Sequence, residues 1–274
     1  MTLTGGRVGP ADPRTLFINA TVAGVLGAAI MVLLHELAHV VTGVLLGLPG
    51  TLYSYGVTHG GSPSPTQLGV TSIAAPVFSL LKGALMVTWQ PLRARRDFWH
   101  LLWLMVAFTS MMEGIGYAEI SVFGAGDTAD AIRHFGWPGW VAPVMLALGV
   151  AGQFGLARIF APMVGRYAGA DKRSRLAFTL WPWLAGTALN LALVGVNLST
   201  ARMDLNGGEM VAIAMAGVAV LVWMPMALIF PRAVDAGSAD AEPLHLRGWP
   251  VVGLVAIGVM IVVNQLLNLG LSIG

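Results

Sequence analysis

Long apolar segments constrain this chain more than any other feature of its sequence. A helix needs about 20 mostly apolar residues to cross the hydrocarbon core of a bilayer. Segments of that kind lie at about 16–47, 67–89, 98–122, 139–163, 176–198, 209–230 and 249–272. Charged residues make up only 10% of the chain, whereas a soluble domain has about 25%. The sequence therefore predicts an all-α polytopic membrane protein with about seven transmembrane helices, and it argues against a soluble enzyme.

The first of these segments is too long for one perpendicular crossing. Its 32 residues would rise about 48 Å as a helix. We expect it to tilt, to kink at Gly24 or Gly27, or to project from the bilayer.

Lysine and arginine are distributed unequally between the two sets of loops. With the loops numbered alternately from the N-terminus, one side holds only Arg133 and Arg202, and Lys82 lies within a span. The other side holds Arg7, Arg14, Arg93, Arg95, Arg96, Arg158, Arg166, Lys172, Arg173, Arg175, Arg232 and Arg247. Because cytoplasmic loops carry the excess of basic residues, we predict an integral protein of the plasma membrane, the bacterial inner membrane, with a cytoplasmic N-terminus. No basic run with interleaved aromatics suggests nucleic-acid binding.

One motif in the first span carries chemistry. The chain has no cysteine, so a bound metal would have to be held by His, Asp or Glu. His35-Glu36-Leu37-Ala38-His39 is an H-E-x-x-H motif, and chance would produce about 0.002 such matches in a chain of this composition. On a helix, positions i and i+4 share one face, so both imidazoles can bind one Zn²⁺ ion. Glu36 then lies beside the metal, where it can act as general base toward a water that the metal activates.

A third metal ligand should come from a carboxylate, because a catalytic zinc site uses three protein ligands and keeps one position open. We favour Asp127, which lies in a Gly-rich break where the backbone can turn a short side chain toward a metal. Glu113 and Glu119 in the third span are alternative ligands, or they support the site indirectly or pair with Lys82. Weaker candidates are Asp130, His59, His100 and His134.

The residues around the motif resemble the site-2 protease (M50) family of intramembrane zinc metalloproteases, over about residues 30–130. Family members carry a Gly eight residues after the second His and then an aromatic-Ser-x-Gly hairpin. Here Gly47 is followed by Tyr53-Ser54-Tyr55-Gly56. The next family helix carries an A-G-P-x-x-N-like segment, and Ala74–Ser79 is similar, with Ser79 in place of Asn. In the family's N-x-x-P-x-P-x-L-D-G stretch, Asp127 fits the position of the third ligand.

The resemblance implies a domain organisation and a function. An N-terminal arm (1–15) would precede a metalloprotease-like core (16–135) with three spans and a short membrane-associated hairpin at 48–66. Four additional transmembrane helices (136–274) match nothing in the family and could bind a membrane-protein partner. The activity implied is zinc-dependent cleavage of a transmembrane-helix protein substrate within the lipid bilayer. The residues implied are Glu36 as general base, His35, His39 and Asp127 on the zinc, and Tyr53, Ser54, Tyr55, Gly56 and Ser79 on the substrate.

Other interpretations of the same residues stay open. A non-proteolytic membrane assembly factor or complex subunit with the same fold would account for Ser79 and for the missing prolines. A transporter that uses Lys82, Glu113 and Glu119 as an ion path should show inverted repeats, which the sequence lacks. Gly124–Asp127 also fits the G-x-G-D signature of presenilin-like aspartyl proteases, but no span contains the second Asp that those enzymes need. The family hairpin usually faces the cytosol, whereas the basic residues place residues 48–66 outside.

Overall fold

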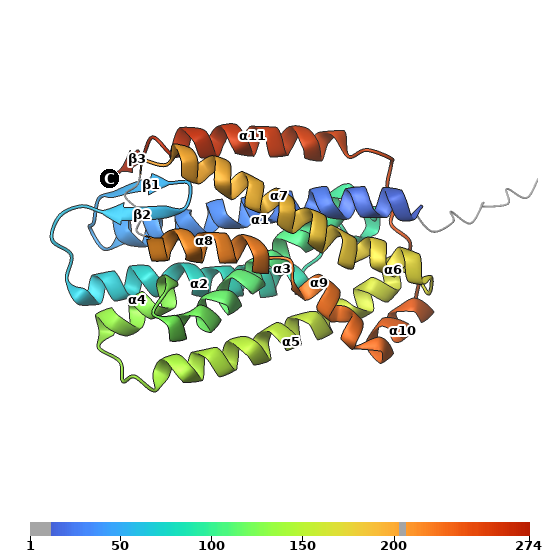
Figure 1. Cartoon of the computed structure of the whole chain (residues 1–274), viewed down its shortest axis with the longest axis horizontal. Helices are drawn as coiled ribbons and strands as arrows, with labels where there is room; N and C mark the ends of the chain where they lie inside the picture. The colour runs from blue at the N-terminus through green and yellow to red at the C-terminus, as the bar shows by residue number, and fades with distance from the viewer. Residues whose placement is uncertain (1–11, 203–206) are drawn as a thin grey trace, which may run out of the picture.

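The computed structural model describes residues 12–202 and 207–274, and long helices dominate it (Figure 1). The longest are α1 (Pro13–Leu45), α2 (Pro65–Thr88), α3 (Phe98–Ile120), α5 (Val141–Ala168) and α7 (Leu180–Thr200). Among the described residues, six helical segments are long and apolar enough to cross a membrane. The 17-residue helix α11 (Val251–Leu267) is at the lower limit of spanning length. The prediction of an all-α polytopic membrane protein is confirmed.

Short helices extend or connect the long ones. They are η1 (Arg93–Arg95), η2 (Ser121–Phe123), α4 (Gly126–Phe135), α6 (Lys172–Phe178), α8 (Gly207–Ala219), α9 (Trp223–Met226), η3 (Ala227–Ile229) and α10 (Pro231–Ala239). The predicted span 209–230 is therefore interrupted between α8 and α9. Pro225 has no N–H to donate to the carbonyl of Leu221, which accepts from the N–H of Met224 instead. The indole of Trp223 donates to the carbonyl of Val220. Arg158, assigned from the sequence to a loop side, lies within α5.

The beginnings of the first three long helices follow from their sequence. Asp12 caps α1 by accepting from the N–H of Thr15. Ser64 and Gln67 form a capping box at the start of α2, which satisfies two backbone donors reciprocally. Asp97 caps α3 by accepting from the backbone of its first turn. Such caps are each worth about 1 kcal/mol, and they fix where each helix begins.

The expected hairpin follows α1, and a third strand joins it. β1 (Gly50–Tyr53) and β2 (Gly56–His59) pair antiparallel, with Tyr53 opposite Gly56. β3 (Leu271–Ile273) pairs antiparallel with the other edge of β1, which gives the order β2-β1-β3. The last predicted span, 249–272, is shorter than expected because α11 ends at Leu267 and the chain turns at Gly270, whose φ is 83°.

The long helices run roughly along the long axis of the molecule, with the strands at one end of the bundle (Figure 1). Aromatic rings fill the core between α3, α5 and α9. Phe108 stacks on Trp223 at 4.9 Å between ring centroids, and Phe160 meets the same indole edge-on at 4.6 Å. Helices α2 and α3 approach closely where a Cβ on Gly114 would lie 2.7 Å from the carbonyl oxygen of Pro76. This close approach, typical of helices packed in lipid, brings residues of α2 and α3 to the same part of α1.

Candidate metal centre

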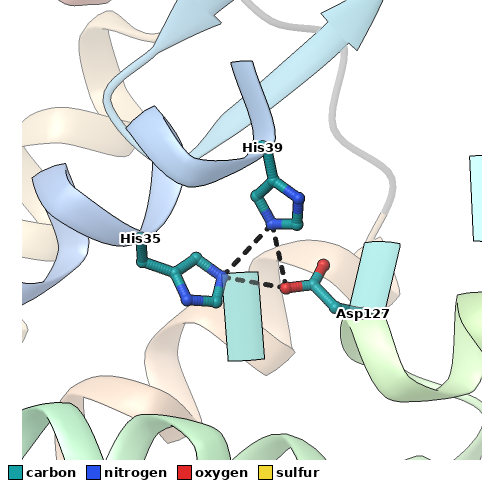
Figure 2. Close-up of side chains that lie close together, drawn as sticks. All are labelled: His35, His39 and Asp127. Carbon is teal, nitrogen blue, oxygen red and sulfur yellow. Dashed lines mark hydrogen bonds and ion pairs between the residues drawn. The ribbon is translucent and has the colours of Figure 1, made fainter. Parts of the chain in front are cut away.

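Three side chains from two helices converge on one point (Figure 2). His35 and His39 lie one turn apart on α1, and Asp127 lies in the first turn of α4. Oδ2 of Asp127 is 2.8 Å from Nε2 of His35 and 3.0 Å from Nε2 of His39, and the two Nε2 atoms are 3.3 Å apart. Asp127 contributes a carboxylate from a segment 92 residues after His35, so the fold assembles this group.

The group has the composition and spacing of a metal site. Two imidazole nitrogens and one carboxylate oxygen match the protein donor set of a catalytic zinc centre, in which water or substrate takes the fourth position. Ligands about 2.0–2.1 Å from a tetrahedral zinc lie about 3.3 Å apart, close to the separations among these three atoms. The residues therefore fit a zinc ion, and among the described residues they form the group that could hold one.

Helix α2 holds both histidines by their other ring nitrogens. Nδ1 of His39 lies 2.8 Å from the backbone carbonyl oxygen of Thr71. A carbonyl only accepts, so Nδ1 of His39 carries a proton, and Nε2 is the ring nitrogen that faces the group of three. Nδ1 of His35 lies 3.3 Å from Oγ of Ser79. Metal-binding histidines commonly use such partners to fix the ring orientation and the tautomer.

Ser79 is fully buried and lies against His35, whereas the family resemblance implies a contact with substrate. We predict that Ser79→Ala weakens zinc binding about 10- to 100-fold, the usual cost of losing a partner of a ligating histidine. A competing chelator of known affinity would measure this. Thr71→Ala is the matched control, because it keeps the carbonyl that His39 uses. Equal zinc affinity in Ser79→Ala and the wild type would contradict this role for Ser79.

Glycines place Asp127 at the histidines. Gly124 and Gly126 have φ of 72° and 77°, a conformation that other residues rarely adopt. A Cβ on Gly126 would lie 2.6 Å from the ring of Tyr117. Burial alone would raise the pKa of Asp127, but the neighbouring charge of His39 and the hydrogen bonds from both histidines outweigh it and lower this pKa. The carboxylate is therefore ionised, as a metal ligand must be.

Tyr117 is a member of this site that the sequence analysis missed. Its ring stacks on that of His35, with centroids 5.0 Å apart and planes 9° from parallel. An aromatic residue in an apolar span gives no spacing signal that would single it out. The stacking holds the imidazole from the side of α3, while Ser79 holds it from α2.

Glu36 lies beside the group and is buried, with 6% of its surface exposed. Its electrostatic neighbours are His35, His39 and Asp127. A buried carboxylate in a span is costly unless it has a function or a partner. Glu36 is therefore a buried carboxylate close to the group of three.

The two alternative carboxylates lie outside the group of three. Glu113 is an electrostatic neighbour of His35 and of Lys82, but the structure has no ion pair between Glu113 and Lys82. The ammonium of Lys82 lies instead 5.1 Å from the ring centre of Phe78. Glu119 packs against α5, where a Cβ on Gly149 would collide with it.

The weaker candidates from the sequence also lie outside the group. His59 packs on Gly43, where an added Cβ would come within 2.7 Å of Nδ1. His100 pairs with the hydroxyl of Tyr167 at 2.8 Å. Asp130 forms an ion pair with Arg133, and His134 lies in the last turn of α4.

The hairpin residues implied as substrate contacts point partly into the protein. The hydroxyl of Ser54 donates to Oδ1 of Asn268, and the hydroxyl of Tyr55 accepts from Nδ2 of Asn197. Tyr53 and Gly56 pair across the hairpin. The backbone of this hairpin, more than its side chains, is thus the part that could meet another chain.

No family model matches the chain, and searches of curated proteins and of solved structures find no match either.

Proposed function

We propose that the chain is an intramembrane zinc metalloprotease whose substrate is a transmembrane-helix protein. The observation that carries the proposal is the convergence of His35, His39 and Asp127 beside Glu36. These residues lie in a bundle of apolar helices that suits the lipid bilayer. The H-E-x-x-H spacing, the donor set and the second partners of both histidines all support the same chemistry.

The roles of the residues follow from their positions. His35, His39 and Asp127 would hold the zinc ion. When bound, zinc supplies a Lewis acid that polarises a carbonyl and lowers the pKa of water. Glu36 accepts the proton of the attacking water and returns it to the nitrogen of the leaving amine, as a general acid–base group does. Tyr117 and Ser79 keep the ring of His35 in place throughout.

A substrate helix has to unwind before its backbone can be cut. Unfolded backbone at membrane depth is tolerated only where protein or water satisfies its polar groups. Because β1 pairs with β3 on its other side, β2 is the outer strand of the hairpin, and its edge could offer backbone hydrogen bonds of the kind that an extended peptide uses when it adds to a sheet. We propose that the peptide becomes extended beside this hairpin, which begins at Gly50, shortly after α1 ends at Leu45.

The orientation of the chain in the membrane is part of the same proposal. The excess of basic residues on one set of loops supports a cytoplasmic N-terminus in the plasma membrane, the bacterial inner membrane. The C-terminal helices 136–274 would be the region that contacts a membrane-protein partner.

The experiment that tests the proposal measures peptide cleavage and zinc content together. Purified protein in detergent is incubated with a set of transmembrane peptides that carry a fluorophore and a quencher. We expect cleavage by the wild type that a chelator stops and added zinc restores. A protein that binds zinc through these residues but cleaves none of the peptides, and none of the membrane proteins of its own cell, would favour the non-proteolytic assembly factor.

A further inference from the structure

The late helices hold the hairpin through a buried polar network. At the hairpin loop, the Ser54 hydroxyl donates to Asn268 and the Tyr55 hydroxyl accepts from Asn197 at 3.3 Å. Nδ2 of Asn268 also donates to the backbone carbonyl of Asn197 at 2.9 Å and to the hydroxyl of Thr200 at 2.8 Å. The network thus joins the hairpin to the end of α7 and to the residue after α11.

The burial of this network makes its geometry costly to change. Ser54 is 4% exposed, Asn197 is 3% exposed and Asn268 is 1% exposed. Gln265 completes the network by donating from Nε2 to Oδ1 of Asn197 at 2.9 Å. When a buried amide loses one hydrogen-bond partner, the unpaired polar atom costs free energy because it stays out of contact with water. A buried hydrogen-bonded network therefore favours one arrangement of its members.

The strand β3 fixes the hairpin at a second place. Two residues after Asn268, Gly270 turns the chain with a φ of 83°, and β3 then pairs with β1, Thr51 opposite Ser272. The same segment of chain therefore holds the hairpin at its loop, through Asn268, and along one edge, through β3.

The hairpin in turn lies against the helix that carries the metal ligands. The His59 ring of β2 packs on Gly43, one turn after His39 on α1. A Cβ on Gly43 would lie 2.7 Å from Nδ1 of His59, so the glycine allows this contact. A shift of the hairpin would change the space beside His39.

We propose that Asn197 and Asn268 are positioning residues that hold the hairpin in the place where it receives an extended substrate beside the metal centre. The proposal rests on the proposed protease function and extends it, because it gives the C-terminal helices a part in the same site. The network is the hairpin clamp, and its members are Ser54, Tyr55, Asn197, Thr200, Gln265 and Asn268.

Asn268→Ala tests the clamp with two independent readouts. We expect the amide hydrogens of residues 50–59 to exchange about tenfold faster, since the one buried hydrogen bond that Asn268 makes to the hairpin, to Ser54, is worth about that factor. In the cleavage assay, KM for the transmembrane peptides should rise about tenfold while kcat and zinc content change little. Asn190→Ala is the matched control, because Asn190 is buried on α7 and its Nδ2 has no hydrogen-bond partner among the described residues. It should change neither hairpin exchange nor KM.

A double-mutant cycle between Ser54→Ala and Asn268→Ala checks that the effect runs through the hairpin. The two changes break the same bond, so their effects on exchange should be clearly less than additive. Asn268→Asp, which keeps the acceptor for Ser54, should recover part of the slow exchange. Unchanged exchange in Asn268→Ala would contradict the clamp, whether or not the wild type cleaves. Faster exchange with an unchanged KM would contradict its role in positioning substrate, whereas a wild type that cleaves nothing would contradict the protease function itself.

Discussion

Glu36→Gln is expected to lower the rate of peptide cleavage by about 10²- to 10⁴-fold, the usual contribution of a general acid–base group. The amide keeps the shape of the buried side chain but cannot accept the proton. Zinc content should stay at the wild-type level, because Glu36 does not contribute any of the three candidate ligand atoms, which belong to His35, His39 and Asp127. Cleavage of labelled transmembrane peptides and zinc content by mass spectrometry, measured on the same preparation, check both parts.

Glu119→Gln is the matched control for this substitution. It also removes a carboxylate from α3, but from a half-buried position at the contact of α3 with α5, away from the histidines. We expect wild-type cleavage from it. A Glu36→Gln protein that cleaves at the wild-type rate would contradict the role of Glu36 as general base.

His39→Ala is expected to weaken zinc binding by more than about 100-fold. Loss of a hydrogen-bond partner of a ligand costs up to about 100-fold, and loss of the ligand itself should cost more. The change removes one of three ligands and leaves the carbonyl of Thr71 without the ring that contacts it. Chelator competition measures the affinity, and circular dichroism checks that the helices remain.

His134→Ala is the control for a lost imidazole. His134 lies in the last turn of α4, the helix that also carries Asp127, but outside the group of three. It should bind zinc as the wild type does. Equal affinity in His39→Ala and His134→Ala would contradict the assignment of His39 as a ligand.

The candidate metal site could be predicted from the sequence because most of its geometry is local. His35 and His39 share a helix face by their spacing alone. Asp127, far along the chain, was favoured for its Gly-rich break and for its fit to the family stretch. The sequence does not predict that Asp127 lies in the first turn of a helix, α4. Tyr117 and the carbonyl of Thr71 could not be predicted, because they depend on how α2 and α3 pack on α1.

The limits of the fold prediction have the same cause. A helix that crosses a bilayer must be long and apolar, so most spans could be predicted from their apolar composition. Strand β3 could not be predicted from the sequence, because its residues continue an apolar segment and pair with a strand more than 200 positions earlier in the chain. The interruption near Pro225 lies within an equally apolar stretch, where hydropathy gives no signal of the break.

X-ray absorption at the zinc edge tests the central claim, a metal centre of two histidines and one carboxylate, most directly. The wild type should bind about one zinc per chain, with nitrogen and oxygen ligands at about 2.0–2.2 Å and the outer-shell scattering of two imidazoles. Asp127→Ala should lose an oxygen ligand or the metal itself. A wild-type protein that binds no zinc, or a zinc spectrum identical in the wild type, His35→Ala and Asp127→Ala, would contradict the assignment.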